Sequence, residues 1–354
     1  MLASLLAAFV DIAFVAATAT ATAASAPALP AWADFEKERA MDCWAPFDAR
    51  ARPLERKIGT AVFRLEGSRL TRLGTAPKKI AIGLLSAIKE AEPDTLENLS
   101  RAKAAFDKAG VDLIVANGDV ALEEFDLEKV MSALGQTGYP VLLLIGNSES
   151  RGAFNRAFVA AEKKHPNLFH LGWVRHVELG PIDLVSLPGY HDRNFMPQSA
   201  GCRYKQEQVD ELSRFVAALS AQQKTAVLIG HGPPRSRGAG AIDRAFEAGN
   251  VGDPMLTTLI EERAIRYGLF GHILEAGGRA TTDLAKGTPA RPGQRHKTLF
   301  VNAGAASATP WTMLDGKASQ GLAMIVSFAG DGASYRVVKL RQESGDVREG
   351  NSGR

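Results

Sequence analysis

The apolar and polar positions of the chain form a regular pattern from Lys78 onward. Short apolar runs bounded by turn residues predict buried strands, and apolar residues recurring at helical spacing predict helices between them. The stretch 168–187 combines short apolar runs with turns and predicts further strands. The expected strands cover 79–85, 111–116, 141–145, 227–229, 269–270, 298–301, 322–328 and 335–340, and the expected helices cover 95–109, 127–134, 153–164, 206–219 and 255–267.

This order of elements predicts an α/β protein. Strands first alternate with helices and then follow one another, which is typical of a sandwich built from mixed sheets. The chain has 354 residues, of which 45% are hydrophobic, so it can bury a sizeable core. The regular pattern indicates one main domain over residues 78–342, followed by a polar tail at 343–354.

The N-terminal part of the chain does not share this pattern. Asp11 is the only charged side chain in residues 1–32, and the small residues Ala24, Ser25 and Ala26 fit a cleavage site. We interpret residues 1–26 as a signal peptide of an exported protein, periplasmic or secreted. The alternative is a disordered Ala-rich leader. Residues 27–77 are rich in Pro, Ala and Arg with little periodicity, and we interpret them as an N-terminal extension.

The charge, the hydrophobic runs and the cysteines of the chain limit which kinds of partner and site can be expected. The net charge of +3 and the lack of a long basic run do not indicate a nucleic-acid-binding protein. The apolar run at the N-terminus is short and interrupted by Asp11, so no membrane span is expected in the mature chain. Cys43 and Cys202 are too far apart in sequence for a thiolate zinc motif. They either form a disulfide, if the protein is exported, or remain separate thiols.

Four polar side chains each follow an expected strand, close behind a glycine. They are Asp119, Asn147, His231 and His272. Glycine allows a tight turn at the strand end, where ligands of open α/β sheets usually bind. A carboxylate, an amide oxygen and two imidazoles suit Mn, Fe or Zn better than Ca. Each cluster alone is an ordinary turn, but together and in this order they predict a metal site.

These motifs resemble those of the calcineurin-like metallophosphoesterases. "NGD", "GNSE", "GHGPP" and "GHIL" match four family motifs in order, and "TLFVNAGAAS" at 298–307 is similar to a fifth stretch. The resemblance covers roughly three-quarters of the chain. It implies a four-layer αββα sandwich of two mixed β-sheets, with two metal ions at the strand ends.

The chain also departs from the family pattern. The first strand should end in Asp-x-His, but "KIAIGLLSAIKE" at 79–90 has no carboxylate or imidazole before Glu90. Ser148 stands where the family has its catalytic histidine, and Leu274 where it has its last histidine. The resemblance therefore implies that one ion retains only Asp119, while the other keeps four ligands: Asp119, Asn147, His231 and His272. We expect one divalent transition metal, Mn, Fe or Zn, and expect Ser148 to cap the next helix.

The function expected from these losses is weak or absent phosphoester hydrolysis, because two-metal catalysis needs both ions. The protein would bind a phosphorylated small molecule or a protein partner, and no residue is assigned as catalytic. One alternative is an active phosphatase or phosphodiesterase with non-standard ligands. Another is a structural or interaction protein that binds no metal. Several auxiliary loop residues could supply the missing contacts to a metal or a phosphate: His191, Asp192, Arg235 and Arg237, with Asp253 in a further loop. The simpler interpretation is that they are solvated loop residues.

Overall fold

Two large β-sheets pack face to face in this computed structural model, which describes residues 28–341. The expected signal peptide and the polar tail therefore lie outside the described residues. The six-stranded sheet has the order β19-β18-β4-β5-β6-β7. Its strands β4 to β7 are parallel, and β18 joins β4 antiparallel. The strands are β4 (Lys79–Leu85), β5 (Leu113–Asn117), β6 (Val141–Leu144), β7 (Leu168–His170), β18 (Leu322–Ala329) and β19 (Gly332–Lys339).

The nine-stranded sheet has the order β1-β2-β3-β8-β9-β10-β13-β15-β14. Its central strands β9, β10, β13 and β15 are parallel. Its strands are β1 (Leu54–Ile58), β2 (Ala61–Glu66), β3 (Arg69–Leu73), β8 (His176–Glu178), β9 (Asp183–Leu187), β10 (Ala226–Gly230), β13 (Tyr267–Phe270), β14 (Ala280–Thr281) and β15 (Leu299–Asn302). Two small hairpins complete the strands, β11 (Arg244–Ala245) with β12 (Gly249–Asn250), and β16 (Trp311–Thr312) with β17 (Ala318–Ser319).

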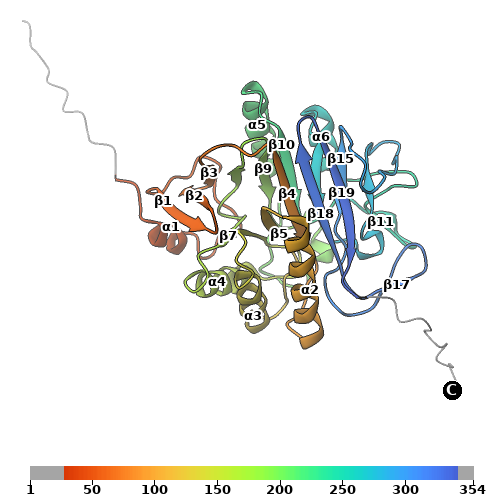
Figure 1. The fold of residues 1–354 in the computed structure, drawn as a ribbon, viewed down its shortest axis with the longest axis horizontal. Coiled ribbons are helices and arrows are strands. Elements are labelled where there is room, and N and C mark those ends of the chain that lie inside the picture. The colour runs from red at the N-terminus through yellow and green to blue at the C-terminus, as the bar shows by residue number, and fades with distance from the viewer. Residues whose placement is uncertain (1–27, 342–354) are drawn as a thin grey trace, which may run out of the picture.

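Helices cover the outer faces of both sheets, which gives the expected four-layer αββα sandwich (Figure 1). Helices α2 (Pro93–Ala109), α3 (Glu124–Gly135) and α4 (Arg151–Glu162) lie on the six-stranded sheet, while α5 (Gln206–Ala221) and α6 (Pro254–Glu262) lie on the other. The remaining helical segments are α1 (Trp32–Glu38), η1 (Arg193–Phe195) and η2 (Leu274–Ala276). No helix within residues 28–341 is long and apolar enough to cross a membrane.

Local sequence signals explain where α2 begins and ends. Pro93 occupies its first turn, where a missing N–H costs nothing. Leu99, Ala102 and Phe106 form its buried face. The helix ends at Gly110, whose φ of 64° is the left-handed conformation that glycine adopts without strain.

Two expectations about helix ends were wrong. The helix expected at 255–267 ends at Glu262, because Ala264 adopts a left-handed φ of 48° and Tyr267 already begins β13. The cap of α4 is Ser150 rather than Ser148, since the Ser150 hydroxyl accepts the backbone N–H of Ala153 at 3.3 Å.

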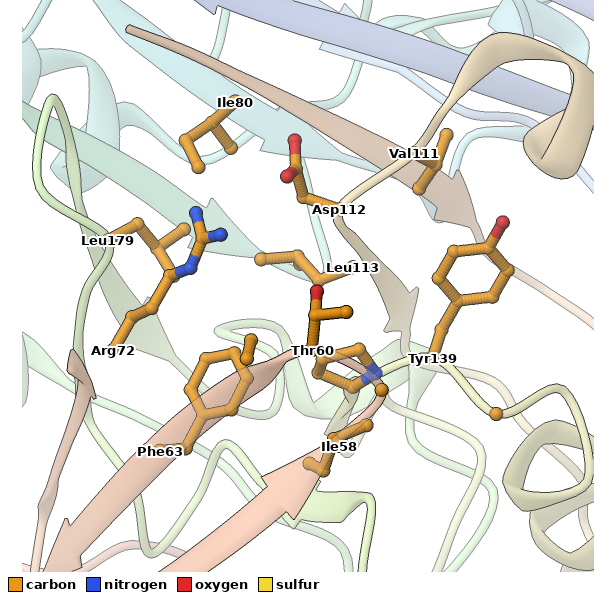
Figure 2. Close-up of a pocket in the computed structure, with 14 residues that line it drawn as sticks. Ile58, Thr60, Phe63, Arg72, Ile80, Val111, Asp112, Leu113, Tyr139 and Leu179 are labelled. Atoms are coloured by element: carbon orange, nitrogen blue, oxygen red, sulfur yellow. The ribbon is translucent and has the colours of Figure 1, made fainter. Parts of the chain in front are cut away.

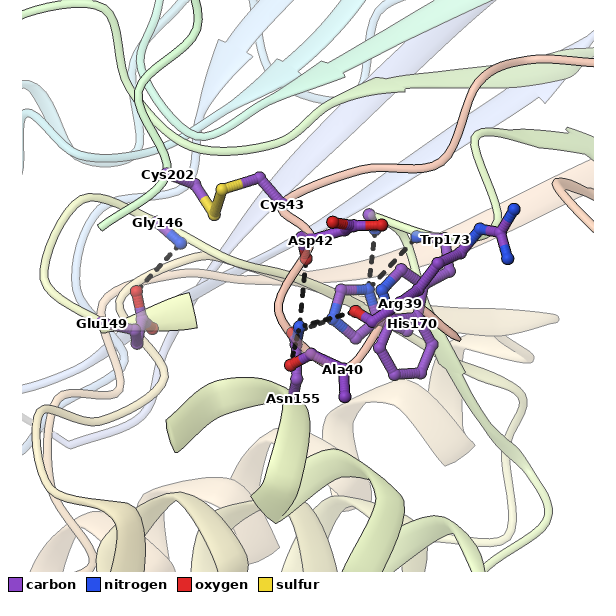
Figure 3. The surroundings of a disulfide bond; sticks show 11 residues. Arg39, Ala40, Asp42, Cys43, Gly146, Glu149, Asn155, His170, Trp173 and Cys202 are labelled. Carbon is purple, nitrogen blue, oxygen red and sulfur yellow. Dashed lines mark hydrogen bonds between the residues drawn. A yellow bond between two sulfur atoms is a disulfide. The ribbon is translucent and has the colours of Figure 1, made fainter. Parts of the chain in front are cut away.

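The N-terminal extension contributes directly to the sandwich. Within residues 27–77, strands β1 to β3 form an antiparallel meander, and β3 pairs in parallel with β8 of the nine-stranded sheet. Cys43 and Cys202 form a disulfide between this extension and the body, with their Cα atoms 5.4 Å apart (Figure 3). The sequence left open whether these cysteines form a disulfide or remain separate thiols, and the structure shows the disulfide.

Asn155 of α4 fixes the segment that precedes Cys43. Its Nδ2 donates to the backbone carbonyls of Arg39, Ala40 and Asp42 at 3.3, 3.1 and 3.0 Å (Figure 3). Nε2 of His170 lies 3.0 Å from Oδ1 of Asn155, while Nδ1 of His170 accepts a backbone N–H. His170 therefore donates from Nε2 and orients the amide. Burial lowers the pKa of His170 to about 3, so the ring is neutral.

Candidate metal site

The structure brings together the four side chains that the sequence predicted as metal ligands. Asp119 follows β5 and Asn147 follows β6 in the six-stranded sheet, whereas His231 follows β10 and His272 follows β13 in the nine-stranded sheet. Ligand atoms of Asp119, His231 and His272 all lie within 4.8 Å of one another. The site therefore lies where the carboxyl ends of strands from both sheets meet, as the strand-end rule predicts.

His231 is oriented by the backbone of β5. Its Nδ1 lies 2.9 Å from the carbonyl oxygen of Asn117, so this nitrogen carries the proton and donates it. Its Nε2 then faces Oδ1 of Asn147 at 2.8 Å and Oδ1 of Asp119 at 3.2 Å. A neutral ring with a lone pair on Nε2 would meet two acceptor oxygens there. This arrangement needs a cation between the three atoms, either a proton or a metal ion.

The amide of Asn147 has a fixed orientation. Its Nδ2 donates to the backbone carbonyl of Phe195, which directs Oδ1 toward His231. Asn117 fixes the two sheets relative to each other, because its buried Nδ2 donates to the carbonyl oxygens of Gly230 and Leu269 at 2.9 and 3.3 Å. No role was predicted for Asn117 from the sequence, since its contacts cross between sheets and leave no local pattern.

Two glycines make the close approach of the ligands sterically feasible. A Cβ atom at Gly118 would collide with the His231 ring, and one at Gly146 would collide with the backbone and carboxylate of Asp119. Gly118 also has a φ of 79°, which favours glycine. The glycines of the "NGD" and "GNSE" motifs are thus required by the packing of the ligands themselves.

His272 is held in a left-handed conformation with a φ of 67°, and Tyr190 packs beside it. The two ring centroids are 4.2 Å apart. Burial and the nearby charge of His231 lower the pKa of His272 to about 3. His272 is therefore neutral and has a lone pair available for a metal ion.

The charges of Asp119 and His231 stabilise each other. Burial alone would raise the pKa of Asp119, but the charge and hydrogen bond of His231 hold it well below its ordinary value. Burial alone would lower the pKa of His231, yet the carboxylate of Asp119 raises it above the ordinary value. Asp119 is thus an anion at neutral pH, which suits a metal ligand.

Lys89 adds a positive charge near this carboxylate. Its backbone N–H donates to the carbonyl oxygen of Asp119 at 3.0 Å, and its charge helps to lower the pKa of both Asp119 and His272. Ala87 and Lys89 have φ values of 46° and 72°, so this segment turns tightly along the loop that carries Asp119. Lys89 was not singled out from the sequence.

Glu149 of the "GNSE" motif is a second buried carboxyl group beside the site, and no role was predicted for it. It accepts the backbone N–H groups of Val120 and Gly146, the latter at 2.9 Å. It thereby fastens the loop of Asp119 to the loop of Asn147. Burial and the negative charge of Asp119 raise the pKa of Glu149 to about 7.

The segments that resemble the other half of a two-metal site carry no charged ligand. Ser86 donates its hydroxyl to the carbonyl of Asn117 at 2.9 Å and lies against Gly271. Ser148 contributes a backbone N–H to Oδ1 of Asp119 at 3.2 Å. Leu274 is buried in η2. None of these three side chains carries a carboxylate or an imidazole.

The proposed auxiliary residues divide into two groups. His191 lies near the site, with its ring 4.5 Å from that of Tyr190, and its Nδ1 is buried without a partner among the described residues. Asp192 instead caps η1 through Asn194. The side chains of Arg235 and Arg237 are exposed; Arg235 donates to the carbonyl of Gly252 at 3.2 Å. Asp253 is structural, since it accepts the Tyr204 hydroxyl at 2.7 Å and caps α6.

A second group of candidate ligands lies at the other end of the nine-stranded sheet. His176, Glu178 and Asp183 have ligand atoms within 4.8 Å of one another. However, Lys224 forms ion pairs with both carboxylates, and Arg69 forms another with Glu178. The negative charge of this group is already balanced, which makes it a salt-bridge network.

Comparison with known proteins supports the fold. No protein-family model matches the sequence, and no curated protein matches it. The structure is similar to purple acid phosphatase PPD1 from yellow lupin (Lupinus luteus) seeds, with a TM-score of 0.50 and 12% identity, covering 80% of this chain and 57% of that one.

Two further solved structures are similar to this one. For TT1561 of Thermus thermophilus the TM-score is 0.48, with 13% identity over 75% of this chain and 100% of that one. For a dimetal phosphatase from Danio rerio the TM-score is 0.45, with 12% identity over 74% and 99%. At such identities the likeness concerns the fold alone. The layers, the strand order and the match to the lupin enzyme show that this chain has the fold of the calcineurin-like metallophosphoesterases.

Proposed function

We propose that this protein binds one divalent transition metal ion, Mn, Fe or Zn, and uses it to hold a phosphate-containing ligand or partner, with weak or no hydrolysis. The observation that carries the proposal is the orientation of His231. Its Nε2 faces two oxygens from the opposite sheet, 2.8 and 3.2 Å away, although Nδ1 is already committed to a carbonyl. Together with His272, these side chains place two nitrogen and two oxygen donors around the candidate metal position, and such a set of donors suits a transition metal ion.

The residues around the ion support binding more than turnover. Asp119, Asn147, His231 and His272 would hold the ion, which supplies a Lewis acid for a phosphoryl oxygen. Ser148 cannot protonate a leaving group at neutral pH, a contribution of typically ~10²–10⁴-fold in hydrolases. The positive charge of Lys89, which lies close enough to lower the pKa of Asp119, favours an anionic ligand at this site.

Metal analysis tests the first part of the proposal. Protein purified without chelator should contain about one transition metal ion per chain by mass spectrometry. His231→Ala and His272→Ala should each abolish binding, because each removes one of four donors. His296→Ala is the matched control, since His296 bonds to the carbonyl of Arg291, outside the site. Two ions per chain would support the active hydrolase, and no ion would support the interaction protein.

Phosphate binding tests the second part. Calorimetric titration of inorganic phosphate into metal-loaded protein should show binding that Lys89→Gln weakens by about fivefold or more. Lys108→Gln is the control, because Lys108 is exposed at the end of α2. Phosphate affinity that is the same with and without metal would contradict a role of the ion in ligand binding.

We also propose that the protein is exported. The Cys43–Cys202 disulfide supports this, since disulfides persist mainly in oxidising compartments. Mass spectrometry of protein from its native host should show cleavage near Ala26. A cytoplasmic protein that retains Met1 would contradict export.

A further inference from the structure

A cavity lies at the opposite edge of the sheets from the candidate metal site. Its volume is about 230 Å³. Ile80, Leu113 and Pro140 line it at the amino ends of β4, β5 and β6, whereas the metal-site residues follow carboxyl ends. Strands β1 to β3 and the turn between β1 and β2 close it from the other side. The cavity is thus formed where the N-terminal extension meets the body.

Arg72 of β3 places a guanidinium group in this cavity. Figure 2 shows it directed into the space enclosed by the other lining side chains. Its Nη1 is buried and has no hydrogen-bond partner among the described residues, and no ion pair of Arg72 is found in the same part of the chain. A buried charged donor that lacks an acceptor is energetically unfavourable. Nη1 of Arg72 is therefore available to an accepting group of a ligand.

Asp112 presents the opposite charge to the same cavity. Its Oδ2 accepts the backbone N–H of Ala81 at 2.8 Å, and its own N–H donates to the carbonyl of Ala81 at 2.7 Å. The carboxylate is thereby fixed in place beside β4. No bond to its Oδ1 is found within residues 28–341, and no ion pair joins Asp112 to Arg72. The two charges face one cavity without neutralising each other.

The remaining walls combine apolar side chains with a smaller polar part that includes Thr60 and Tyr139. Ile58, Phe63, Ile80, Leu113 and Leu179 surround the two charged groups (Figure 2). Sites for drug-sized ligands have volumes of roughly 300–1,000 Å³, so this cavity is too small for a nucleotide. Its charges match a ligand with a carboxylate and an ammonium group on a short apolar frame.

We propose that this cavity binds a small zwitterion, an α-amino acid with an aliphatic or aromatic side chain. The ligand's carboxylate pairs with the fork of Arg72, a geometry that guanidinium favours. Its ammonium pairs with the carboxylate of Asp112, and its side chain contacts the apolar walls. This site is independent of the metal site and of the proposed function there.

Calorimetric titration of the full chain with L-leucine and L-phenylalanine tests the proposal. Leucine amide, which lacks the carboxylate, and 4-methylpentanoate, which lacks the amine, should bind about tenfold more weakly or not at all. Arg72→Met should abolish binding while the fold is kept, because it replaces the half-buried guanidinium, whose Nη1 has no partner among the described residues, by an apolar chain of similar length. Asp112→Asn retains an acceptor for Ala81 and should weaken binding by about tenfold. Arg214→Met, exposed on α5, is the control.

Each alternative result overturns the proposal. If neither amino acid binds the natural protein, the cavity is not an amino-acid site. If 4-methylpentanoate binds as tightly as leucine and Asp112→Asn has no effect, the cavity takes simple carboxylates. If Arg72→Met leaves leucine binding unchanged, the ligand binds elsewhere. None of these outcomes depends on metal content, so the result does not affect the test of the proposed function.

Discussion

Nε2 of His231 lies 2.8 Å from Oδ1 of Asn147, and these two residues extend from different sheets of the sandwich. A metal ion bound between them would cross-link the two layers. Because such an ion binds the folded protein and not the unfolded chain, it stabilises the fold by mass action.

Removal of the metal should therefore lower the melting temperature. At a free metal concentration about 100 times the dissociation constant, the stabilisation is about 2.7 kcal/mol, or a shift of roughly 5 °C for a chain of this size. Thermal unfolding with Mn²⁺ or Zn²⁺, and then with a chelator, measures it. His231→Ala should show no metal-dependent shift, whereas a shift of the same size in that variant would place the ion elsewhere.

Gly118→Ala should reduce metal affinity by about tenfold or more, since the added Cβ displaces the His231 ring. The variant also places alanine at a φ of 79°, which alone destabilises the fold by about 1 kcal/mol. Gly138→Ala separates the two effects, because Gly138 has a φ of 77° with nothing within 4 Å of its added Cβ. Equal losses of metal affinity in both variants would show that backbone strain, and not the His231 contact, is responsible.

Loss of the disulfide should destabilise the protein without removing the metal. The cystine spans 159 residues, so the loop-closure argument sets a contribution of at most about 5 kcal/mol. Unfolding in denaturant of Cys43→Ser/Cys202→Ser, compared with the natural protein, measures it. The backbone carbonyl of Cys202 accepts the N–H of Tyr190, whose ring packs on His272. Neither cysteine is adjacent in sequence to a candidate metal ligand, so metal binding should be retained. Two reactive thiols in unfolded, unreduced protein would contradict the bond.

Glu36 should make the protein less stable as the pH rises from about 4.5 to above 7. Burial and the nearby charge of Glu162 raise the pKa of Glu36 to about 7 from its ordinary 4.5. Between these values the folded state binds more protons than the unfolded state, so stability falls with increasing pH, by up to about 3 kcal/mol from this group. Glu36→Gln mimics the protonated form and should make this part of the profile less steep, leaving the contribution of Glu149, whose pKa is also raised to about 7.

The control for Glu36 is Glu38→Gln on the same helix, because Glu38 is exposed. Denaturant unfolding at pH 5 and pH 8 measures the difference for each variant. A pH dependence in Glu36→Gln as large as in the natural protein would assign the effect to other groups.

The sequence predicted the parts of the fold that have strong local patterns. The strand expected at 79–85 is β4, because the six residues after the exposed Lys79 are all buried and form one apolar run. Strand β1 was missed, since Glu55, Arg56 and Lys57 give it no apolar alternation. Its formation depends on pairing with β2, which a local window does not detect.

In the candidate site, too, residues with a local sequence pattern could be predicted, whereas residues that depend on long-range contacts could not. The four candidate ligands could be predicted because each follows an apolar strand and a glycine, in an order that resembles a known family. Asn117 and Lys89 were missed, since their contribution depends on contacts between segments remote in sequence. Arg72 was missed for the same reason, because the extension and the body form its cavity together.

Rebuilding the absent ligands should raise phosphodiesterase activity if their absence explains weak catalysis. The sequence left two registers open for the first pair, Leu84/Ser86 and Leu85/Ala87. The structure instead indicates that the pair should begin at Ser86, because Leu84 and Leu85 belong to β4 whereas Ser86 follows it, with its hydroxyl against Gly271 and bonded to Asn117. The variant to build is Ser86→Asp/Ile88→His/Ser148→His/Leu274→His, assayed with excess Mn²⁺.

An aryl phosphodiester is the appropriate substrate, because its good leaving group needs little acid assistance. The natural protein should stay near background, and the rebuilt variant should exceed it by about tenfold or more. Circular dichroism and thermal unfolding must first show that the variant folds, since polar groups replace the buried Ile88 and Leu274. Adding His231→Ala to the rebuilt variant should remove the gain. Strong activity in the natural protein that His231→Ala abolishes would contradict the expectation and would direct attention to His191, a third imidazole beside Tyr190.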